Sequence, residues 1–288
     1  MKKNELLIAS SMAIFGTISL FVKAIPLSSG EIALFRAVLA LILIGGYLCI
    51  AKKKLPVREI KKALPVLFLS GAAMGINWIL LFEAYNYTSV SVATLSYYFA
   101  PVIVTLACPV LFKEKLGKMQ ILCFIMSTIG LIMIIGVSGF GEGTSDFKGI
   151  LLGLGAACFY ATVILLNKLT KGVSGIHRTF IQFLSAAVVL LPYTLLTNGI
   201  HVLSLNAKAA AYLLIVGLVH TGVSYIMYFS SLKELPGQKA AILSYIDPLV
   251  SVIVSVLILK EGITPLQIAG GTLILLFTLL NEIHPKKT

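Results

Sequence analysis

Charged residues are scarce in this chain, and acidic ones most of all. Only 12% of its 288 residues are charged, with 11 acidic side chains against 23 basic ones. Hydrophobic residues make up 58%, and the mean hydropathy is +1.00. So little polar surface cannot keep a globular domain of this length in water. The composition therefore excludes a soluble enzyme and indicates a membrane protein.

Motifs for metal, redox and nucleotide chemistry are missing from the sequence as well. The four cysteines, Cys49, Cys108, Cys123 and Cys158, lie within or at the ends of apolar stretches, and no pair has metal-ligand or redox spacing. We expect them to pack as small buried hydrophobic residues. There is no Walker-type phosphate loop, no His-x-x-x-His pattern and no paired carboxylates on facing segments. We therefore expect no enzyme, no ATP hydrolysis, no metal and no cofactor.

Long apolar stretches are what the chain has instead. Each is long enough to cross a hydrocarbon core of about 30 Å at about 1.5 Å per helical residue. We expect an all-α integral membrane protein with ten transmembrane helices. Their predicted ranges are 5–22, 31–50, 64–83, 90–112, 118–137, 149–167, 177–197, 209–231, 238–259 and 265–283. The first range resembles a signal peptide, but its length and the nine segments that follow favour an uncleaved first helix.

Lysine and arginine are unevenly divided between the two sets of loops. One face collects 18 of them and the other only Lys23, Lys148, Lys208 and Lys260, with Arg36 left inside the second segment. Basic residues accumulate on the cytoplasmic side of short loops, so we expect both termini in the cytoplasm and the protein in the cell membrane. The basic residues form no continuous stripe, so nucleic acid is not an expected partner.

The second half of the chain repeats the first. Offsets of 145 and 147 align the following pairs: Phe15 with Tyr160, Lys23 with Lys168, Tyr98 with Tyr245, Pro101 with Pro248, Lys113 with Lys260, and Glu114 with Glu261. Five segments in each half would make the halves enter the membrane from opposite sides, as in many secondary transporters. The expected organisation is a first repeat at 1–139, an external linker at 140–148, a second repeat at 149–283 and a cytoplasmic tail at 284–288.

The two best-matched stretches carry a family resemblance. Residues 93–101 read ATLSYYFAP and lead to KEKL at 113–116, and residues 241–248 read AILSYIDP and lead to KEG at 260–262. They resemble the paired signature of the EamA family in the drug/metabolite transporter superfamily, and the resemblance extends over nearly the whole chain. It implies two inverted five-helix repeats around a central cavity, with alternating access by rocking of the repeats. Solutes in that family include amino acids, sugars, nucleotide-like metabolites and cationic drugs.

Two prolines and one carboxylate interrupt the apolar segments, and all three are candidates for functional residues. Pro101 and Pro248 remove backbone hydrogen bonds within a segment, so each could hinge a helix, line a site or simply kink it. Asp247 directly precedes Pro248, where an ionised carboxylate needs a partner or water. It is a candidate counter-charge for a cation or a proton-coupling group, and helix bonding is the structural alternative.

Three further polar residues are candidates for coupling or gating. Arg36 could pair loosely with Glu31, reach the interface or contact a solute carboxylate, and the repeat places Gln182 at its counterpart. Glu83 ends the third segment as an external gate or a solvated interfacial carboxylate. His220, in the middle of the eighth segment, is a proton-relay candidate or a neutral side chain hydrogen-bonded across helices. Glu114 and Glu261 sit among lysines at helix boundaries, where ion pairing or capping is expected.

Aromatic and amide side chains occur in the segments that the resemblance places around the cavity. Such faces can hold an apolar side chain or an organic ammonium by cation–π contact, worth roughly 0.5–2 kcal/mol each, and ordinary packing is the alternative for any one of them. The expected substrate-binding set, besides Asp247, is Phe15, Asn77, Trp78, Tyr97, Tyr98, Tyr160, Tyr225, Tyr228 and Tyr245.

Together these residues favour a secondary transporter that moves a small amphipathic metabolite, in particular an amino acid or a related compound, with export as the expected direction. A carrier of organic cations or quaternary ammonium drugs, with Asp247 and the aromatic residues as its site, is the alternative. A membrane-embedded enzyme and a scaffold that transports nothing fit less well. One duplicated chain can enclose a pathway by itself, so a monomer and a dimer are both compatible with the sequence.

Overall fold

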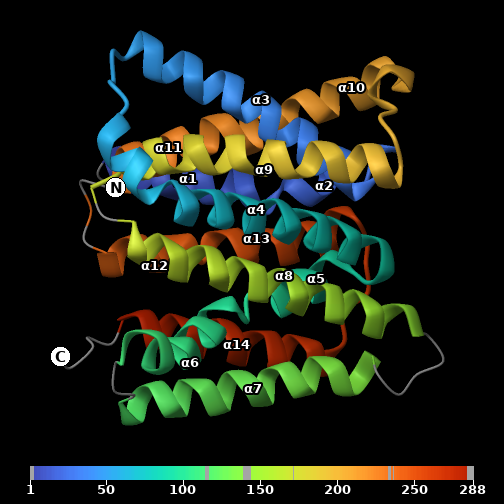
Figure 1. Ribbon diagram of the computed structural model, residues 1–288. Coiled ribbons are helices and arrows are strands. Elements are labelled where there is room, and N and C mark those ends of the chain that lie inside the picture. Colours follow the sequence, from blue (N-terminus) through green and yellow to red (C-terminus); the bar gives the residue numbers. More distant parts are fainter. Residues whose placement is uncertain are drawn as a thin grey trace.

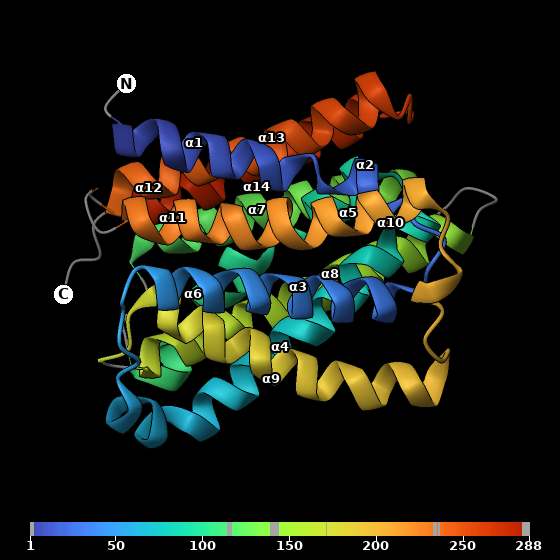
Figure 2. The same cartoon turned by 90° about the horizontal axis from the view of Figure 1, so that it is seen from above.

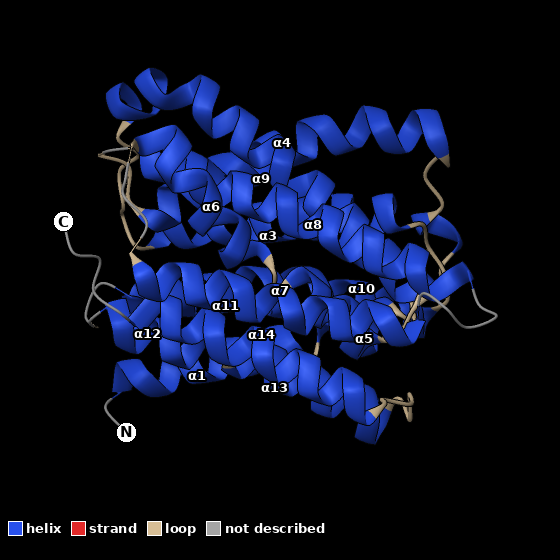
Figure 3. Ribbon diagram, turned by 90° about the horizontal axis from the view of Figure 1, so that it is seen from below, coloured by secondary structure: helices blue, strands red, loops and turns tan. Residues whose placement is uncertain are grey.

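A computed structural model describes residues 3–113, 117–138, 144–170, 172–232, 235 and 237–283, and every regular element within these ranges is a helix. Figure 3 shows only helices and loops over this part of the chain. The predicted tail 284–288, residues 140–143 of the predicted linker and Glu114 lie outside it. The described remainder of that linker, 144–148, forms the first turns of a helix.

The described helices cover the ten predicted segments, and some of them extend beyond the predicted ends. In chain order they are α1 (Lys3–Gly16), α2 (Ile18–Val22), α3 (Ser29–Ile50), α4 (Val57–Tyr87), α5 (Val90–Tyr97), α6 (Ala100–Phe112), α7 (Lys118–Ser138), α8 (Thr144–Leu169), α9 (Gly175–Thr197), η1 (Val202–Ser204), α10 (Ala207–Leu214), η2 (Ile215–Val223), α11 (Ser224–Leu232), α12 (Gly237–Ser244), α13 (Ile246–Ile253), η3 (Val254–Ile258) and α14 (Pro265–Ile283). Within the described ranges, 7 helical stretches are long and apolar enough to cross a membrane, and three more are shorter apolar helices at 118–134, 242–258 and 265–281.

The helices run side by side, with their connections gathered at the two ends of the bundle (Figure 1). Helix α1 begins and α14 ends at the same end. Contacts join the two halves of the chain throughout: α4 packs on α8 and α9, α3 on α9, and α7 on α14. Helix α1 lies along α11, α12 and α13, as Figure 2 shows from above. The halves therefore interlock and do not form separate lobes.

Short polar side chains set several helix starts. Ser28 accepts the backbone N–H of Glu31 at 3.2 Å and begins α3, and Ser89 accepts that of Val92 at 3.3 Å before α5. Asn206 does the same for Ala209 at 2.9 Å before α10. Each cap satisfies a backbone donor that the first helical turn leaves without a partner. The polar residues between apolar stretches thus fix where each helix begins.

Two of the predicted segments break at equivalent places. The chain leaves the helix at Tyr98 and Phe99 between α5 and α6, and at Tyr245 between α12 and α13. Pro101 and Pro248 follow within the first turn of the next helix, where a missing N–H costs little. The predicted interruptions are confirmed, and each lies just before the proline. Further on, Lys113 and Lys260 both take the left-handed conformation, with φ of 56° and 58°.

Small residues allow close contacts between the helices. A side chain at Gly71 would collide with the backbone of Gln182 in α9, and one at Gly153 would lie 3.0 Å from the carbonyl oxygen of Ala93 in α5. Gly75 and Gly149 likewise face Leu190 and Thr88. These glycines therefore form small-residue packing surfaces on α4 and α8.

The prediction for the cysteines is half wrong. Cys108 and Cys123 are buried, whereas Cys49 and Cys158 are exposed on the outside of the bundle. Large apolar side chains such as Val110 are exposed on the same outer surface, at 81% for that residue. In lipid a small apolar side chain has no need of burial, because the solvent is as apolar as the protein core. Free thiols are therefore tolerated there.

Candidate functional site

Two chains of aromatic rings bring together the predicted aromatic residues. In the first chain Phe15 contacts Tyr225, with ring centroids 5.2 Å apart, and Phe183 connects Tyr225 to Trp78 at 5.2 and 5.3 Å. Tyr228 reaches this chain through Phe229, which lies 5.1 Å from it and 6.0 Å from Tyr225. These rings come from α1, α4, α9 and α11. The first chain thus joins both halves of the sequence.

The second chain of rings follows the two helix breaks. Tyr160 of α8 contacts Tyr97 at 5.3 Å, Tyr97 contacts Tyr98 at 5.8 Å, and Tyr98 contacts Tyr245 at 6.3 Å. Tyr98 and Tyr245 are the equivalent residues of the two halves. Edge and tilted contacts at these distances are the favoured geometries of aromatic pairs. The break residues are therefore held against each other by their own side chains.

Asp247 is bonded to the second chain of rings. The Tyr98 hydroxyl donates a hydrogen bond of 2.7 Å to its Oδ2 atom, and the carboxylate is half-buried. Asp247 lies in the first turn of α13, where free backbone N–H groups favour a negative charge. Its backbone carbonyl faces Gly16, where an added Cβ would lie only 2.6 Å from the oxygen. Helix α1 therefore passes directly against the carboxylate-bearing turn.

Arg36 is buried, with 5% of its surface exposed, and does not contact Glu31. Its Nε donates to the Thr221 hydroxyl at 2.7 Å, and its guanidinium lies 4.3 Å above the Trp78 ring and 5.4 Å from that of Phe82. Thr221 belongs to η2, a π-helical stretch of the kind often found at functional sites. The guanidinium is thus held by α3, α4 and η2 together.

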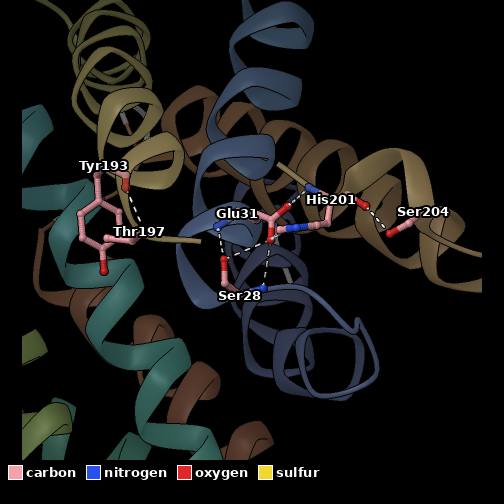
Figure 4. Close-up of polar contacts among 6 residues, drawn as sticks. All are labelled: Ser28, Glu31, Tyr193, Thr197, His201 and Ser204. Carbon is pink, nitrogen blue, oxygen red and sulfur yellow. Dashed lines mark hydrogen bonds and ion pairs between the residues drawn. The ribbon is translucent and has the colours of Figure 1, made fainter. Parts of the chain in front are cut away.

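Glu31 is occupied elsewhere, which corrects the expected loose pair with Arg36. Its carboxylate accepts the Ser28 hydroxyl at 3.2 Å and the His201 backbone N–H at 2.5 Å, and lies 3.6 Å from the His201 ring (Figure 4). Its role is to cap α3 and to bind the loop that follows α9. The pattern Ser28-x-x-Glu31 is a capping-box signature and could have revealed this role in the sequence.

His220 and Glu83 each make local bonds between neighbouring helices. His220 is buried in η2, with Nε2 at 3.0 Å from the Thr17 hydroxyl and Nδ1 at 3.3 Å from the Ile215 carbonyl oxygen. Thr17 is the break between α1 and α2. Glu83 accepts the Ser29 hydroxyl at 2.6 Å in the last turns of α4. Their coupling or gating roles stay predictions.

The Asn77 amide also has a partner within the protein. Its Nδ2 donates to the Ala156 carbonyl oxygen at 2.7 Å, which joins α4 to α8. The side chain is 2% exposed. One of its two amide N–H groups is thus used to hold the helices together.

The separate groups lie within electrostatic range of one another. Arg36, Tyr97, Tyr225 and Asp247 all interact in this way, and so does Tyr85, which the sequence does not single out. The sequence does not identify Thr221 or Phe183 either, because a threonine or a phenylalanine in an apolar segment has no distinguishing pattern. The described part of the chain holds no cluster of three metal-binding side chains. The described candidate residues thus bring together one cation, one carboxylate and a set of aromatic rings.

Ion pairs join the first and ninth predicted segments at both ends. Lys23, at the end of α2, contacts Glu261, and Glu5, near the start of α1, contacts Lys239 of α12 at 2.6 Å. The expected ion pairing and capping by Glu261 are confirmed, because it also accepts the Val90 backbone N–H at 2.8 Å before α5. Phe15 of the first segment and Tyr245 and Asp247 of the ninth lie between these two ends along the chain.

Comparison with known proteins agrees with this architecture. A model of the EamA-like transporter family matches residues 2–136 and 147–282. The uncharacterized transporter YxxF of Bacillus subtilis is 28% identical over 84% of this chain and 78% of its own. An uncharacterized transporter of Archaeoglobus fulgidus is 26% identical over 96% and 94%, and protein PecM of Dickeya dadantii is 24% identical over 71% and 69%. A solved crystal structure shares the fold, with a TM-score of 0.66, 14% identity and coverage of 98% and 96%.

Proposed function

The chain belongs to the EamA-like transporter family, and from this premise we propose that it is a secondary transporter for a small amphipathic metabolite, in particular an amino acid or a related compound. Transport runs by alternating access, with export as the physiological direction. The observation that carries the proposal is the bond between Tyr98 and Asp247 at the two helix breaks, surrounded by aromatic rings. A mid-segment carboxylate beside aromatic rings is suited to an organic ammonium group.

The architecture that we propose is ten spans in two inverted five-helix repeats. The contacts support it, because they come in matching pairs: α4 with α8 corresponds to α1 with α11, and α6 with α8 corresponds to α13 with α1. The second and seventh segments, α3 and α9, pack on each other, as do the fifth and tenth, α7 and α14. The common positions of the helix breaks and of the left-handed residues Lys113 and Lys260 give further support.

Orientation in the cell membrane follows from the loops. We propose that both termini face the cytoplasm, since 18 of the basic residues fall on the face that carries the chain ends. The common position of the start of α1 and the end of α14 supports a shared side. The repeats keep the boundaries 1–139 and 149–283, with 140–148 outside the cell and 284–288 inside. A monomer suffices for transport, because both repeats stand in one chain.

The alternative function is transport of an organic cation. Asp247 and the tyrosines are compatible with it, because aromatic rings and a carboxylate together form the usual cage for a quaternary ammonium group. The two functions differ in whether the solute also carries an acidic group. Both are secondary transport and use the same site.

The test is made on purified protein in detergent and in liposomes. Thermal unfolding is measured across amino acids, polyamines and quaternary ammonium compounds, since a ligand that binds only the folded state raises the midpoint. Stabilising compounds are then loaded into vesicles and their efflux is followed. Amino acids that stabilise the protein and leave protein-containing vesicles, but not empty ones, support the proposal. Correctly folded protein that moves no member of the panel would count against transport of this solute class.

A further inference from the structure

Arg36 is a buried cation with no carboxylate partner in the described part of the chain. It lies seven residues after the start of α3, roughly 10 Å into the segment at 1.5 Å per residue. Ion pairs formed by described residues involve Lys23, Lys239 and His201, and none involves Arg36. A charge placed this deep in a membrane protein is costly unless it is paired or has a function. The missing partner therefore calls for an explanation.

The residues around Arg36 bond the Nε side of its guanidinium, and its two Nη atoms are left to contact something else. Nε is bonded to the Thr221 hydroxyl, whose own proton goes to the Val216 carbonyl oxygen at 2.8 Å. Trp78 covers one face at 4.3 Å. Among the described residues, the two terminal Nη atoms have no hydrogen-bond acceptor. Such an end-on pair of donors, fixed in direction, matches the two oxygens of a carboxylate.

We infer that Arg36 binds the carboxylate of the transported solute through its two Nη atoms, while Asp247 receives the solute's ammonium group. This assignment rests on the proposed function and deepens it, because it makes the substrate class a zwitterion. Arg36 and Asp247 come from opposite halves of the chain and lie within electrostatic range of each other. The aromatic rings that lie beside these two side chains take the apolar part of the solute.

Charge balance separates this assignment from transport of an organic cation. The proposed site has one positive and one negative side chain, Arg36 and Asp247, and a zwitterion matches each with its opposite charge. A simple organic cation would add a second positive charge within range of Arg36, in a medium where the repulsion is only weakly screened. The arginine thus selects against the alternative solute as well as for the proposed one.

The second half of the chain supplies a matched control. Gln182 is the repeat counterpart of Arg36 and is equally buried, at 1% exposed. Its amide nitrogen already donates to Ser70 at 2.5 Å and to Asn167 at 2.8 Å. Its amide nitrogen therefore has protein acceptors, whereas the two Nη atoms of Arg36 have none among the described residues. Gln182→Ala should disturb helix packing to a comparable degree without touching the solute's carboxylate.

The experiment measures calorimetric binding of three related probes to the intact purified protein. Three probes are compared for each of leucine, phenylalanine and lysine: the free amino acid, its primary amide and its N-acetyl derivative. The amide lacks the carboxylate, and the N-acetyl compound lacks the charged α-amine. Wild-type protein should bind the acid about ten- to a hundredfold more tightly than the amide, the range of hydrogen bonds to charged groups. Arg36→Gln should bring this ratio near one, Arg36→Lys should keep part of it, and Gln182→Ala should keep all of it.

Each result bears on the assignment. The wild-type comparison needs no mutant, so a poorly folding Arg36 variant does not block the test. Equal binding of acid and amide to wild-type protein overturns the assignment, as does an unchanged ratio in Arg36→Gln, or no binding by any probe that carries a carboxylate. In those cases efflux of amides or quaternary ammonium compounds from vesicles would leave the transport function standing. Absence of any efflux would remove that function too.

Discussion

Lys23 Nζ lies 2.5 Å from Glu261 Oε1, which ties the end of α2 to the residues that follow η3. The other carboxylate oxygen accepts the Ser255 hydroxyl at 2.6 Å and the Val90 backbone N–H at 2.8 Å. At the opposite end of the same two segments, Glu5 pairs with Lys239. If the repeats rock so that these two segments separate at one end, the ion pair at that end has to break.

Glu261 should matter more for stability than its partner Lys23. Glu261→Ala leaves the Val90 N–H and the Ser255 hydroxyl without their acceptor, at about 1–3 kcal/mol for a buried group. Lys23→Ala removes one arm of a partly exposed pair, worth about 0.2–1 kcal/mol. Thermal unfolding of both variants in detergent checks the order. An equal or larger loss in Lys23→Ala would show that the ion pair, and not the cap, stabilises this end.

Asp247 should carry more of the binding energy than the hydroxyl that contacts it. Asp247→Asn removes the charge, and affinity for a solute with an ammonium group should fall about ten- to a hundredfold. Tyr98→Phe keeps the charge and the ring and loses only one hydrogen bond, so the loss should stay below about tenfold. Binding calorimetry with a stabilising solute makes the comparison, and Tyr193→Phe, an exposed tyrosine outside the ring chains, is the control. Unchanged affinity in Asp247→Asn would contradict the counter-charge.

A proton gradient should drive transport, with Asp247 as the coupling group. Of the three titratable candidates, Glu83 and His220 bind neighbouring helices through Ser29 and Thr17, whereas Asp247 stands beside the ring faces. In vesicles, an imposed pH gradient should accelerate net flux in wild-type protein, Glu83→Gln and His220→Gln, but not in Asp247→Asn. Solute exchange, which needs no net proton movement, should continue in all four. Wild-type flux that ignores the gradient would rule out proton coupling.

Gly16 should tolerate no side chain, because α1 touches α13 at the turn that bears Asp247. A Cβ at this position would lie 2.6 Å from the Asp247 carbonyl oxygen and 2.7 Å from Val250 Cβ. Gly16→Ala should therefore destabilise the protein by about 1–3 kcal/mol, as overpacking usually does. Gly46→Ala in α3 is the control, since no atom lies within 4 Å of its Cβ position. The thermal midpoint should fall only in the first variant, and a midpoint unchanged by Gly16→Ala would mean that the helices can separate there freely.

Hydropathy predicts the helices of this chain well because lipid demands an unbroken apolar length from each of them. The main differences lie at helix starts. Helix α4 begins at Val57, seven residues before the predicted 64, since Arg58, Lys61 and Lys62 continue the helix beyond its apolar part. Apolar length measures only the part of a helix that can lie in hydrocarbon. It does not detect the polar part of a helix that extends beyond the hydrocarbon.

Side-chain pairing could be predicted only in part. The repeat identified Tyr98 and Tyr245 as equivalent, but the bond from Tyr98 to Asp247 joins residues 149 apart and has no signature in the sequence. Arg36 was recognisable as a buried cation, yet its partner Thr221 stands in a π-helical stretch that apolar residues do not distinguish from an α-helix. Local patterns decide helices and caps, whereas contacts between distant segments depend on how the helices pack.

The hydrogen bond between Arg36 and Thr221 also has a consequence for synthesis, because 185 residues separate the two. At roughly 5–20 residues per second, about 10–40 s pass between the appearance of the arginine and that of its hydroxyl partner. Trp78 emerges much earlier, within roughly 2–8 s on the same scale. The ring that stacks on Arg36 in the finished protein is thus the first of its contacts to reach the membrane, and it can shelter the charge from lipid until the eighth segment arrives.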